Sequence, residues 1–220
     1  MDWTALRLSL ELAGWTALLL LPLGTWIARE LAWRRIAGKA WFEALVALPL
    51  VLPPTVLGYY LLTAFGGASW LGQAYQSVAG RPLAFSFEGL LLASIVFNLP
   101  FAVQPMQRAF EAIPHDVREA AWVSGLSRWS AFRRVELPLA WPGIVSSLVL
   151  TVAHTVGEFG VVLMMGGNIP GETRTISIAI YDRVQAFDEH AAATMSAMLL
   201  AFSLVAIGIV YALSDRGRRN

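Results

Sequence analysis

Apolar residues gather along the chain in five long stretches, and shorter segments that hold most of the charged side chains separate them. A helix rises about 1.5 Å per residue, so about 20 mostly apolar residues cross the hydrocarbon core of a bilayer. The stretches that reach this length are residues 10–28, 42–65, 89–109, 143–165 and 191–213. The pattern predicts an all-α membrane protein, a bundle of about five transmembrane helices.

Composition agrees with this pattern, because 57% of the residues are hydrophobic, 14% are charged and the mean hydropathy is +0.60. Soluble domains of this length rarely have so few charges. The formal charge of +1 does not suggest nucleic acid as a partner, since nucleic-acid-binding proteins usually carry a concentrated basic face. The chain has no cysteine, which excludes disulfides and thiolate ligands. We expect one domain, residues 1–220, with lipid around it.

The distribution of Lys and Arg predicts the orientation, because positive residues near span ends are retained in the cytoplasm. One side holds Arg29, Arg34, Arg35, Lys39, Arg108, Arg118, Arg128, Arg133, Arg134, Arg216, Arg218 and Arg219. The other side holds Arg7, Arg81, Arg174 and Arg183. This alternation predicts an outside N-terminus, a cytoplasmic C-terminus and five spans. A secretory signal is the alternative for the first stretch, but it lacks a clear small-residue cleavage site, so we expect a retained span.

A short polar segment, residues 114–138, carries helix signals of its own. Asp116 followed three residues later by Glu119 forms a capping-box-like start. Gly125 suits a left-handed C-terminal cap, and Ser127 suits the N-cap of a second, basic helix. The first helix has about two turns and small alanines on its surface, so it cannot bury itself alone. We expect it to contact another protein.

This segment resembles the coupling helix by which bacterial ABC importer permeases bind their ATPase subunits. The residues that carry the resemblance are Glu119, Ala120, Ala121, Gly125, Leu137 and Pro138. The resemblance implies a cytoplasmic coupling helix, with the Leu-Pro pair where the chain turns into the membrane. An ordinary amphipathic loop helix with positive-inside charges is the alternative.

Three further segments resemble those of the molybdate ABC transporter permeases. They are residues 48–59 (LPLVLPPTVLGY), 157–160 (GEFG) and 167–175 (GNIPGETRT). The resemblance implies the type I importer permease fold and a bacterial inner membrane location. It also implies three kinds of partner: a second copy of the chain, two cytoplasmic ABC ATPase subunits, and a periplasmic oxyanion-binding protein. Molybdate is the implied cargo, with tungstate, sulfate and thiosulfate left open as similar oxyanions.

A polar stripe follows one helical face in the fourth stretch. Its members are Ser147, Thr151, His154, Thr155 and Glu158. Ionisable residues at membrane depth usually face the bundle interior or a wet cavity, so the stripe is our candidate translocation pathway. A hydrogen-bonded seam between helices is the alternative. Because a negative charge would repel an oxyanion, we expect Glu158 to have a structural or gating role, with His154 or Arg174 as its partner.

Small and helix-breaking residues predict further local features. Prolines inside the second and third stretches predict kinks or local unwinding, since they remove backbone donors: Pro49, Pro53, Pro54, Pro100 and Pro105.

In the fifth stretch, a stripe of small residues suits tight helix packing, within the subunit or across a dimer: Ala193, Ala197 and Ala201.

Two other function classes compete with a transporter subunit. A membrane metalloenzyme is disfavoured, because the predicted topology separates His115, His154 and His190 and a catalytic zinc ion generally needs three protein ligands. A passive channel would leave residues 114–138 without a purpose. The chain also lacks a GxxxxGK[ST] phosphate-binding loop. We therefore expect no catalysis, no metal and no cofactor here, with ATP bound by the partner subunit.

Overall fold

The computed structural model describes the backbone of residues 1–34 and 37–219, and the side chains of that part up to residue 212. Arg35, one of the predicted cytoplasmic arginines, lies outside the described residues. Within the described part the chain forms helices joined by short loops, and no strand is present. The predicted all-α architecture is confirmed.

Three long helices lie side by side in the centre of the molecule: α1 (Trp3–Trp33), α5 (Phe87–Glu111) and α8 (Leu137–Gly157). Their close approach depends on glycine. A Cβ placed on Gly143 would lie 2.4 Å from the Cβ of Ala109, so α8 contacts α5 almost backbone to backbone. Small residues allow such contacts between membrane helices, where van der Waals packing drives association.

Within residues 1–34 and 37–219, four helical segments are long and apolar enough to cross a membrane, and a bent pair of helices brings the number to as many as five. The segments are Trp3–Trp33, Phe87–Glu111, Arg128–Gly157 and Glu189–Ala212, the last being part of α11 (Glu189–Arg219). The predicted first, third and fifth spans are confirmed as helices. The chain is a multi-pass membrane protein.

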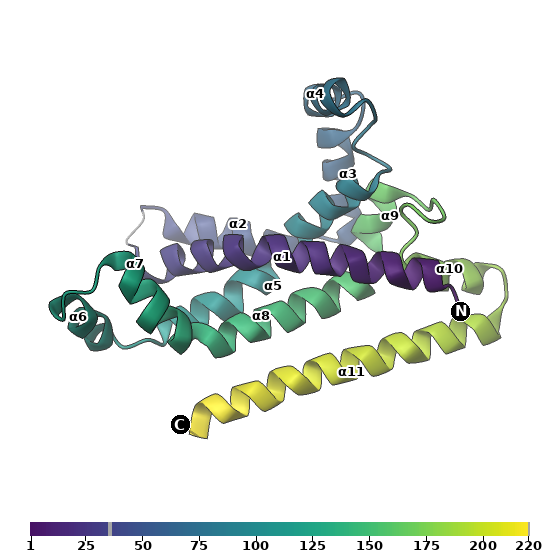
Figure 1. The fold of residues 1–220 in the computed structure, drawn as a ribbon. Coiled ribbons are helices and arrows are strands. Elements are labelled where there is room, and N and C mark those ends of the chain that lie inside the picture. Colours follow the sequence, from purple (N-terminus) through teal and green to yellow (C-terminus); the bar gives the residue numbers. More distant parts are fainter. Residues whose placement is uncertain (35–36, 220) are drawn as a thin grey trace.

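The predicted second span, residues 42–65, is not one helix but a broken pair. The halves are α2 (Lys39–Val51) and α3 (Pro54–Phe65), and the chain bends by 111° between them. Leu52 precedes Pro53 and is extended, with φ −71° and ψ 136°, as the proline ring requires of its neighbour. Figure 1 shows α3 and α4 (Trp70–Ala79) projecting away from the bundle that α2 follows.

The third span shows the opposite outcome. α5 stays helical through both of its prolines, Pro100 and Pro105, so the predicted unwinding is confirmed only in the second span. A single interior proline removes one backbone hydrogen bond, and the neighbouring turns hold the helix together.

The predicted fourth span, residues 143–165, is also interrupted. α8 ends at Gly157, Glu158 is extended with ψ 137°, and a short helix, α9 (Gly160–Gly166), follows. At its other end α8 continues a helical run that starts at α7 (Arg128–Ala131) and passes through a π-helical turn, Phe132–Glu136. The span is therefore longer at the predicted cytoplasmic end and broken near the other.

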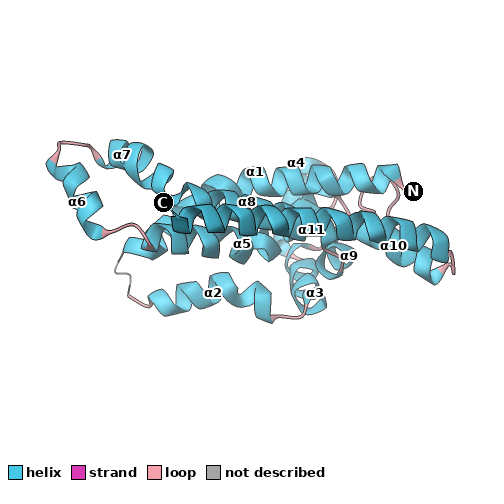
Figure 2. Ribbon diagram, turned by 90° about the horizontal axis from the view of Figure 1, so that it is seen from below, coloured by secondary structure: helices cyan, strands magenta, loops and turns pink. Residues whose placement is uncertain are grey.

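The two ends of the bundle carry different segments. Figure 1 shows α6 (His115–Val123) and α7 at one end, and the N-terminus with α10 (Ile176–Gln185) at the other. Figure 2 shows α11 running along the bundle, where it contacts α8 and α10. Its alanine stripe, Ala193, Ala197 and Ala201, is exposed, so these residues do not pack within the subunit.

Candidate functional site

The predicted coupling helix is present as α6, but its start differs from the prediction. The helix begins at His115 directly after Pro114, and no side chain caps it. Asp116 lies inside the first turn, so the predicted capping box is wrong. Proline precedes the helix and fixes its own φ near the helical value, so it sets the start without a side-chain cap.

The predicted end of this helix is confirmed. Gly125 has φ +82°, the left-handed region that favours glycine. Its N–H donates to the carbonyl of Trp122 at 3.0 Å, and the Leu126 N–H donates to that of Ala121 at 3.1 Å. This pair of bonds is a Schellman motif, which satisfies the last carbonyls of a helix. The second predicted cap is also confirmed, because Ser127 Oγ accepts from the Ser130 N–H at 3.2 Å.

The predicted coupling residues divide between two surroundings. Glu119, Ala120 and Gly125 are exposed on α6 and its cap, whereas Ala121 is buried. Leu137 and Pro138 lie in the first turn of α8, continuous with the π-helical turn, so the predicted change of direction at this pair is wrong. The Leu137 N–H donates to the carbonyl of Phe132, so the helical run continues up to Pro138 through the wider π-helical turn.

The exposed surface of α6 is apolar near its end. Val123 is 88% exposed and Trp122 is 42% exposed. Large apolar side chains at a water-facing tip are typical of a surface that another protein covers.

Sequence patterns missed a buried ion-pair cluster that fixes α6 to the bundle. Glu136, only 1% exposed, accepts from Arg29 of α1 through Nε at 2.7 Å and a terminal guanidinium nitrogen at 3.2 Å. Arg118 of α6 points its Nε toward the same carboxylate at 3.6 Å. One carboxylate therefore links the first span, α6 and the base of the fourth span. We name Arg29, Arg118 and Glu136 the arginine–glutamate cluster.

Aromatic rings surround this cluster. The Arg118 guanidinium lies 3.5 Å from the ring centre of Trp33 and 5.2 Å from that of Trp122, a cation–π arrangement. Trp33 Nε1 donates to the carbonyl of Phe110 at 3.2 Å. Burial lowers the pKa of Arg118 below its ordinary value, and the Glu136 carboxylate opposes that shift. The sequence did contain one signal for this cluster, because Glu136 is the only acidic residue between Glu119 and Glu158.

The polar stripe of α8 is largely buried within the subunit. Ser147, Thr151 and Thr155 are each at most 1% exposed. Thr155 donates to the carbonyl of Thr151 at 2.8 Å in its own helix. The hydroxyls of Ser147 and Thr151 are without a hydrogen-bond partner among the described residues.

His154 takes part in a polar chain across three helices. Its Nδ1 lies 2.9 Å from Asn98 Oδ1 on α5, and its ring stacks on Phe101 with centroids 4.0 Å apart. Asn98 donates to the Ser94 carbonyl at 2.8 Å, and Thr16 of α1 donates to Ser94 Oγ at 3.0 Å. This part of the stripe fits the alternative interpretation of the sequence, a hydrogen-bonded seam between helices.

Glu158 lies in the break between α8 and α9, 5% exposed, and neither carboxylate oxygen has a hydrogen-bond partner among the described residues. Both predicted partners bind elsewhere. His154 contacts Asn98, and Arg174 donates to Asn168 at 2.7 Å. Those pairings are therefore wrong in this conformation. A buried polar group without a partner is costly, and such groups concentrate where a protein changes state.

Two of the segments that carry the family resemblance meet at this break. A Cβ placed on Gly160, at the start of α9, would lie 2.7 Å from the Cβ of Pro54, at the start of α3. One placed on Gly58 would lie 2.6 Å from the Cβ of Met164. Both broken spans therefore contact each other through glycines beside Glu158.

The third segment, residues 167–175, forms a polar loop at the end of the bundle opposite α6. Asn168 donates to both carboxylate oxygens of Asp182 at 2.9 Å, and Arg174 pairs with the same carboxylate at 3.5 Å. Gly167 and Gly171 adopt φ +67° and +79°, which lets the loop turn twice. The Asp182 carboxylate on α10 thus orders this loop.

The three histidines lie on different elements: His115 on α6, His154 on α8 and His190 on α11. On α6, His115, Asp116 and Glu119 bring possible ligand atoms within 4.8 Å of one another. All three side chains are exposed, and His115 Nδ1 lies 3.3 Å from Glu119 Oε1 as an i, i+4 pair. Such clusters are common on helix surfaces without an ion.

Comparison with known proteins gives the family. A molybdenum transport system permease protein of Azotobacter vinelandii is 47% identical over 210 residues, 96% of this chain and 93% of that protein. Its counterpart in Escherichia coli K12 is 36% identical over 207 residues, 94% and 90% of the two chains. A probable sulfate transport system permease protein of Chlorella vulgaris is 30% identical over 209 residues, 95% and 78%.

The fold is also found among solved structures. A chain of a bacterial ABC transporter involved in the import of alginate matches with a TM-score of 0.69 at 20% identity, over 98% of this chain and 78% of that one. The family model for binding-protein-dependent transport system inner membrane components matches residues 21–219. The predicted importer permease fold is thus confirmed. The chain belongs to the family of inner-membrane permease components of binding-protein-dependent transport systems.

Proposed function

We propose that this permease carries molybdate into the cytoplasm as a homodimer driven by two ABC ATPase subunits, with a periplasmic oxyanion-binding protein delivering the cargo. The substrate assignment is supported by the 47% identity to a molybdenum permease, against 30% for the sulfate permease of Chlorella. Sulfate is the second candidate because both anions are divalent and tetrahedral.

One observation carries the coupling role: α6, a helix with an exposed apolar end, is joined to two spans through a single buried carboxylate. Closure of the ATPase subunits on ATP moves α6. Because Arg118 faces Glu136 and Glu136 holds Arg29, that movement reaches α1 and α8 together. Buried charge pairs resist separation, so the cluster transmits force instead of yielding.

The subunit supplies the path and its gate, whereas the ATPase supplies the energy. The sequence lacks a GxxxxGK[ST] loop, so hydrolysis belongs to the partner. The positive-inside distribution assigns α6 to the cytoplasm, with the N-terminus outside. Glu158, at the contact between the two broken spans, acts in gating, because its buried side chain has no hydrogen-bond partner among the described residues in this conformation. Among the remaining stripe residues, His154 ties α8 to α5 through Asn98, whereas Ser147, Thr151 and Thr155 make no side-chain hydrogen bond to another helix among the described residues.

Transport by the assembled complex tests the proposal. The permease is reconstituted into proteoliposomes with its ATPase subunits, ATP inside and the cognate binding protein outside, and labelled molybdate uptake is measured against unlabelled sulfate. We expect uptake that sulfate does not suppress. Uptake suppressed equally by sulfate would replace molybdate with the second candidate.

Coupling is tested separately with Val123→Glu on α6. A charge at this exposed apolar tip should lower ATPase binding and substrate-stimulated ATP hydrolysis while the subunit stays folded. Val78→Glu on α4, where Val78 is 90% exposed, is the matched control and should leave both unchanged. Unchanged hydrolysis in Val123→Glu would refute the coupling role of α6.

A further inference from the structure

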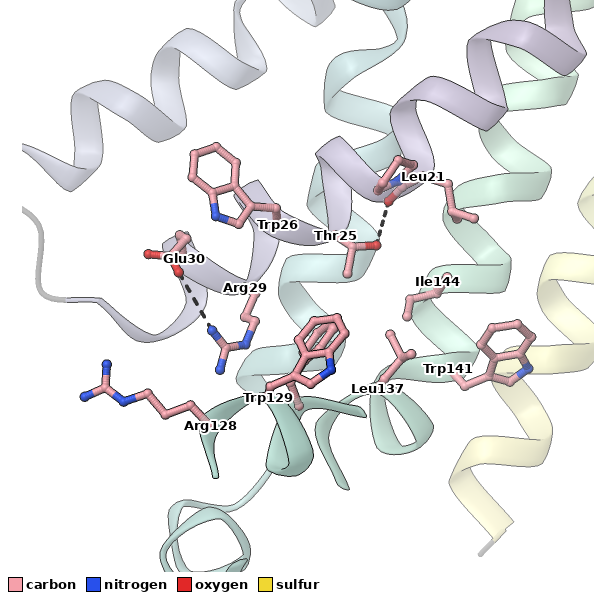
Figure 3. Close-up of a pocket in the computed structure, with 12 residues that line it drawn as sticks. Leu21, Thr25, Trp26, Arg29, Glu30, Arg128, Trp129, Leu137, Trp141 and Ile144 are labelled. Atoms are coloured by element: carbon pink, nitrogen blue, oxygen red, sulfur yellow. Dashed lines mark hydrogen bonds and ion pairs between the residues drawn. The ribbon is translucent and has the colours of Figure 1, made fainter. Parts of the chain in front are cut away.

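A cavity of about 660 Å³ opens between α1, α7 and α8, at the end of the bundle that carries α6. Its lining changes from apolar to charged along α1, from Leu21 and Thr25 to Arg29 and Glu30 (Figure 3). Leu21 and Arg29 lie eight residues apart, about 12 Å along the helix axis. On α8, Ile144 lies on the apolar side with Thr25, and Leu137 lies next to Trp129 of α7 (Figure 3). The cavity is therefore elongated and amphipathic.

Tryptophans mark its rim. Trp26, Trp129 and Trp141 line the cavity and are 63%, 68% and 57% exposed. Exposed tryptophan at the ends of membrane helices is typical of the headgroup level, where the ring is half in hydrocarbon. The rim therefore lies at the boundary between acyl chains and headgroups.

The charged end has an uncompensated positive charge. Arg29 is held by Glu136, and Glu30 forms an ion pair with Arg34. Arg128 lines the same end and forms no ion pair with any side chain that the structure describes. An anionic group there would meet a guanidinium at the water boundary.

We propose that this cavity binds an anionic glycerophospholipid, with an acyl chain along Leu21 and Ile144 and its phosphate on Arg128. The polarity gradient matches that of a lipid in register with the surrounding leaflet. Basic pockets between membrane helices take anionic headgroups in the same way. A soluble ATPase subunit fits less well, because the apolar end is about 12 Å deeper than the charged end along α1 and therefore in hydrocarbon. The proposal depends on the membrane fold and not on the cargo or the coupling role.

Native mass spectrometry of the purified full-length subunit tests the site. The protein is equilibrated with equal amounts of dioleoylphosphatidylglycerol and dioleoylphosphatidylethanolamine, and retained lipid is counted. We expect wild type to retain phosphatidylglycerol preferentially, and Arg128→Gln to lower that retention about tenfold, as expected when one charge-assisted contact is lost. Arg108→Gln is the control, because Arg108 is 82% exposed at the same end and outside the cavity.

A second variant probes the apolar end. Leu21→Trp fills the cavity, so it should lower retention of both lipids while gel filtration shows an unchanged folded peak. Equal retention of phosphatidylglycerol by wild type, Arg128→Gln and Leu21→Trp would overturn the proposal. Unchanged lipid retention together with weaker ATPase binding by Arg128→Gln would overturn it as well, and would assign the cavity to the partner protein.

Discussion

Removing the charge of Glu136 is the sharpest perturbation that the structure offers. Glu136→Gln keeps the shape of the side chain but leaves Arg29 and Arg118 facing each other without a carboxylate. Breaking a buried ion pair from one side costs about 3–5 kcal/mol. Arg29 is 25% exposed, so solvent offsets part of the loss, and we expect about 3 kcal/mol. That corresponds to a change in the folding equilibrium on the order of a hundredfold.

The assay is unfolding of the purified subunit in graded SDS, followed by tryptophan fluorescence. Glu88→Gln is the matched control, because Glu88 pairs with Arg81 at an exposed site where such pairs contribute about 0–1 kcal/mol. The double variant Arg29→Gln with Glu136→Gln should lose less stability than the sum of the two single variants. Each single substitution leaves the partner residue with an unpaired charge, and the double substitution leaves neither. Equal losses for Glu136→Gln and Glu88→Gln would contradict a stabilising role for the cluster.

Three further variants test other parts of the site. Gly160→Ala should destabilise the folded subunit by about 1–3 kcal/mol in the same SDS titration, because the new Cβ would lie 2.7 Å from the Cβ of Pro54. Gly14→Ala is the control and should not destabilise the subunit, because the space around Gly14 is open. Equal effects of the two substitutions would contradict the close contact. Glu158→Gln removes the acidic group at the break and should impair gating without changing oxyanion selectivity in the uptake assay. Altered selectivity would instead indicate direct contact with substrate. Gly125→Asp should weaken the left-handed cap of α6 by about 1 kcal/mol and lower the amount of ATPase subunit that co-purifies with the permease. Unchanged co-purification would argue against a role for the cap.

Hydrophobic periodicity predicted where the chain lies in the membrane, but not where its helices break. Both outcomes for proline occur in this chain: α5 continues through Pro100 and Pro105, whereas the second span breaks at Pro53-Pro54. Two adjacent prolines remove consecutive donors and force Leu52 into an extended conformation. Sequence alone does not distinguish a proline that a helix tolerates from a proline that breaks it, because the tertiary contacts that support a kinked helix are not local.

The break at Glu158 has a local signal in Gly157 and Gly160, which lower helix propensity on both sides of a charged residue. The apolar sequence around them is nevertheless long enough to be taken for one span, and the contact between Gly160 and Pro54 is not local. Glu136 was missed for the same reason, since its partner Arg29 lies 107 positions away. In contrast, the cap at Gly125 depends on bonds within six residues, and the sequence predicted it correctly.

One continuous helix, α8, lies between the proposed coupling helix and the proposed gate. From Leu137 to Gly157, α8 is 21 residues long, which is about 31 Å of helix between the arginine–glutamate cluster and the break at Glu158. The π-helical turn Phe132–Glu136 lies directly before it, and such turns concentrate at functional positions in helices. A tilt imposed on Glu136 by α6 therefore displaces the far end of α8, where α9 packs on α3. Under the proposed mechanism, the polar seam through His154 keeps α8 aligned with α5 and α1 during that movement.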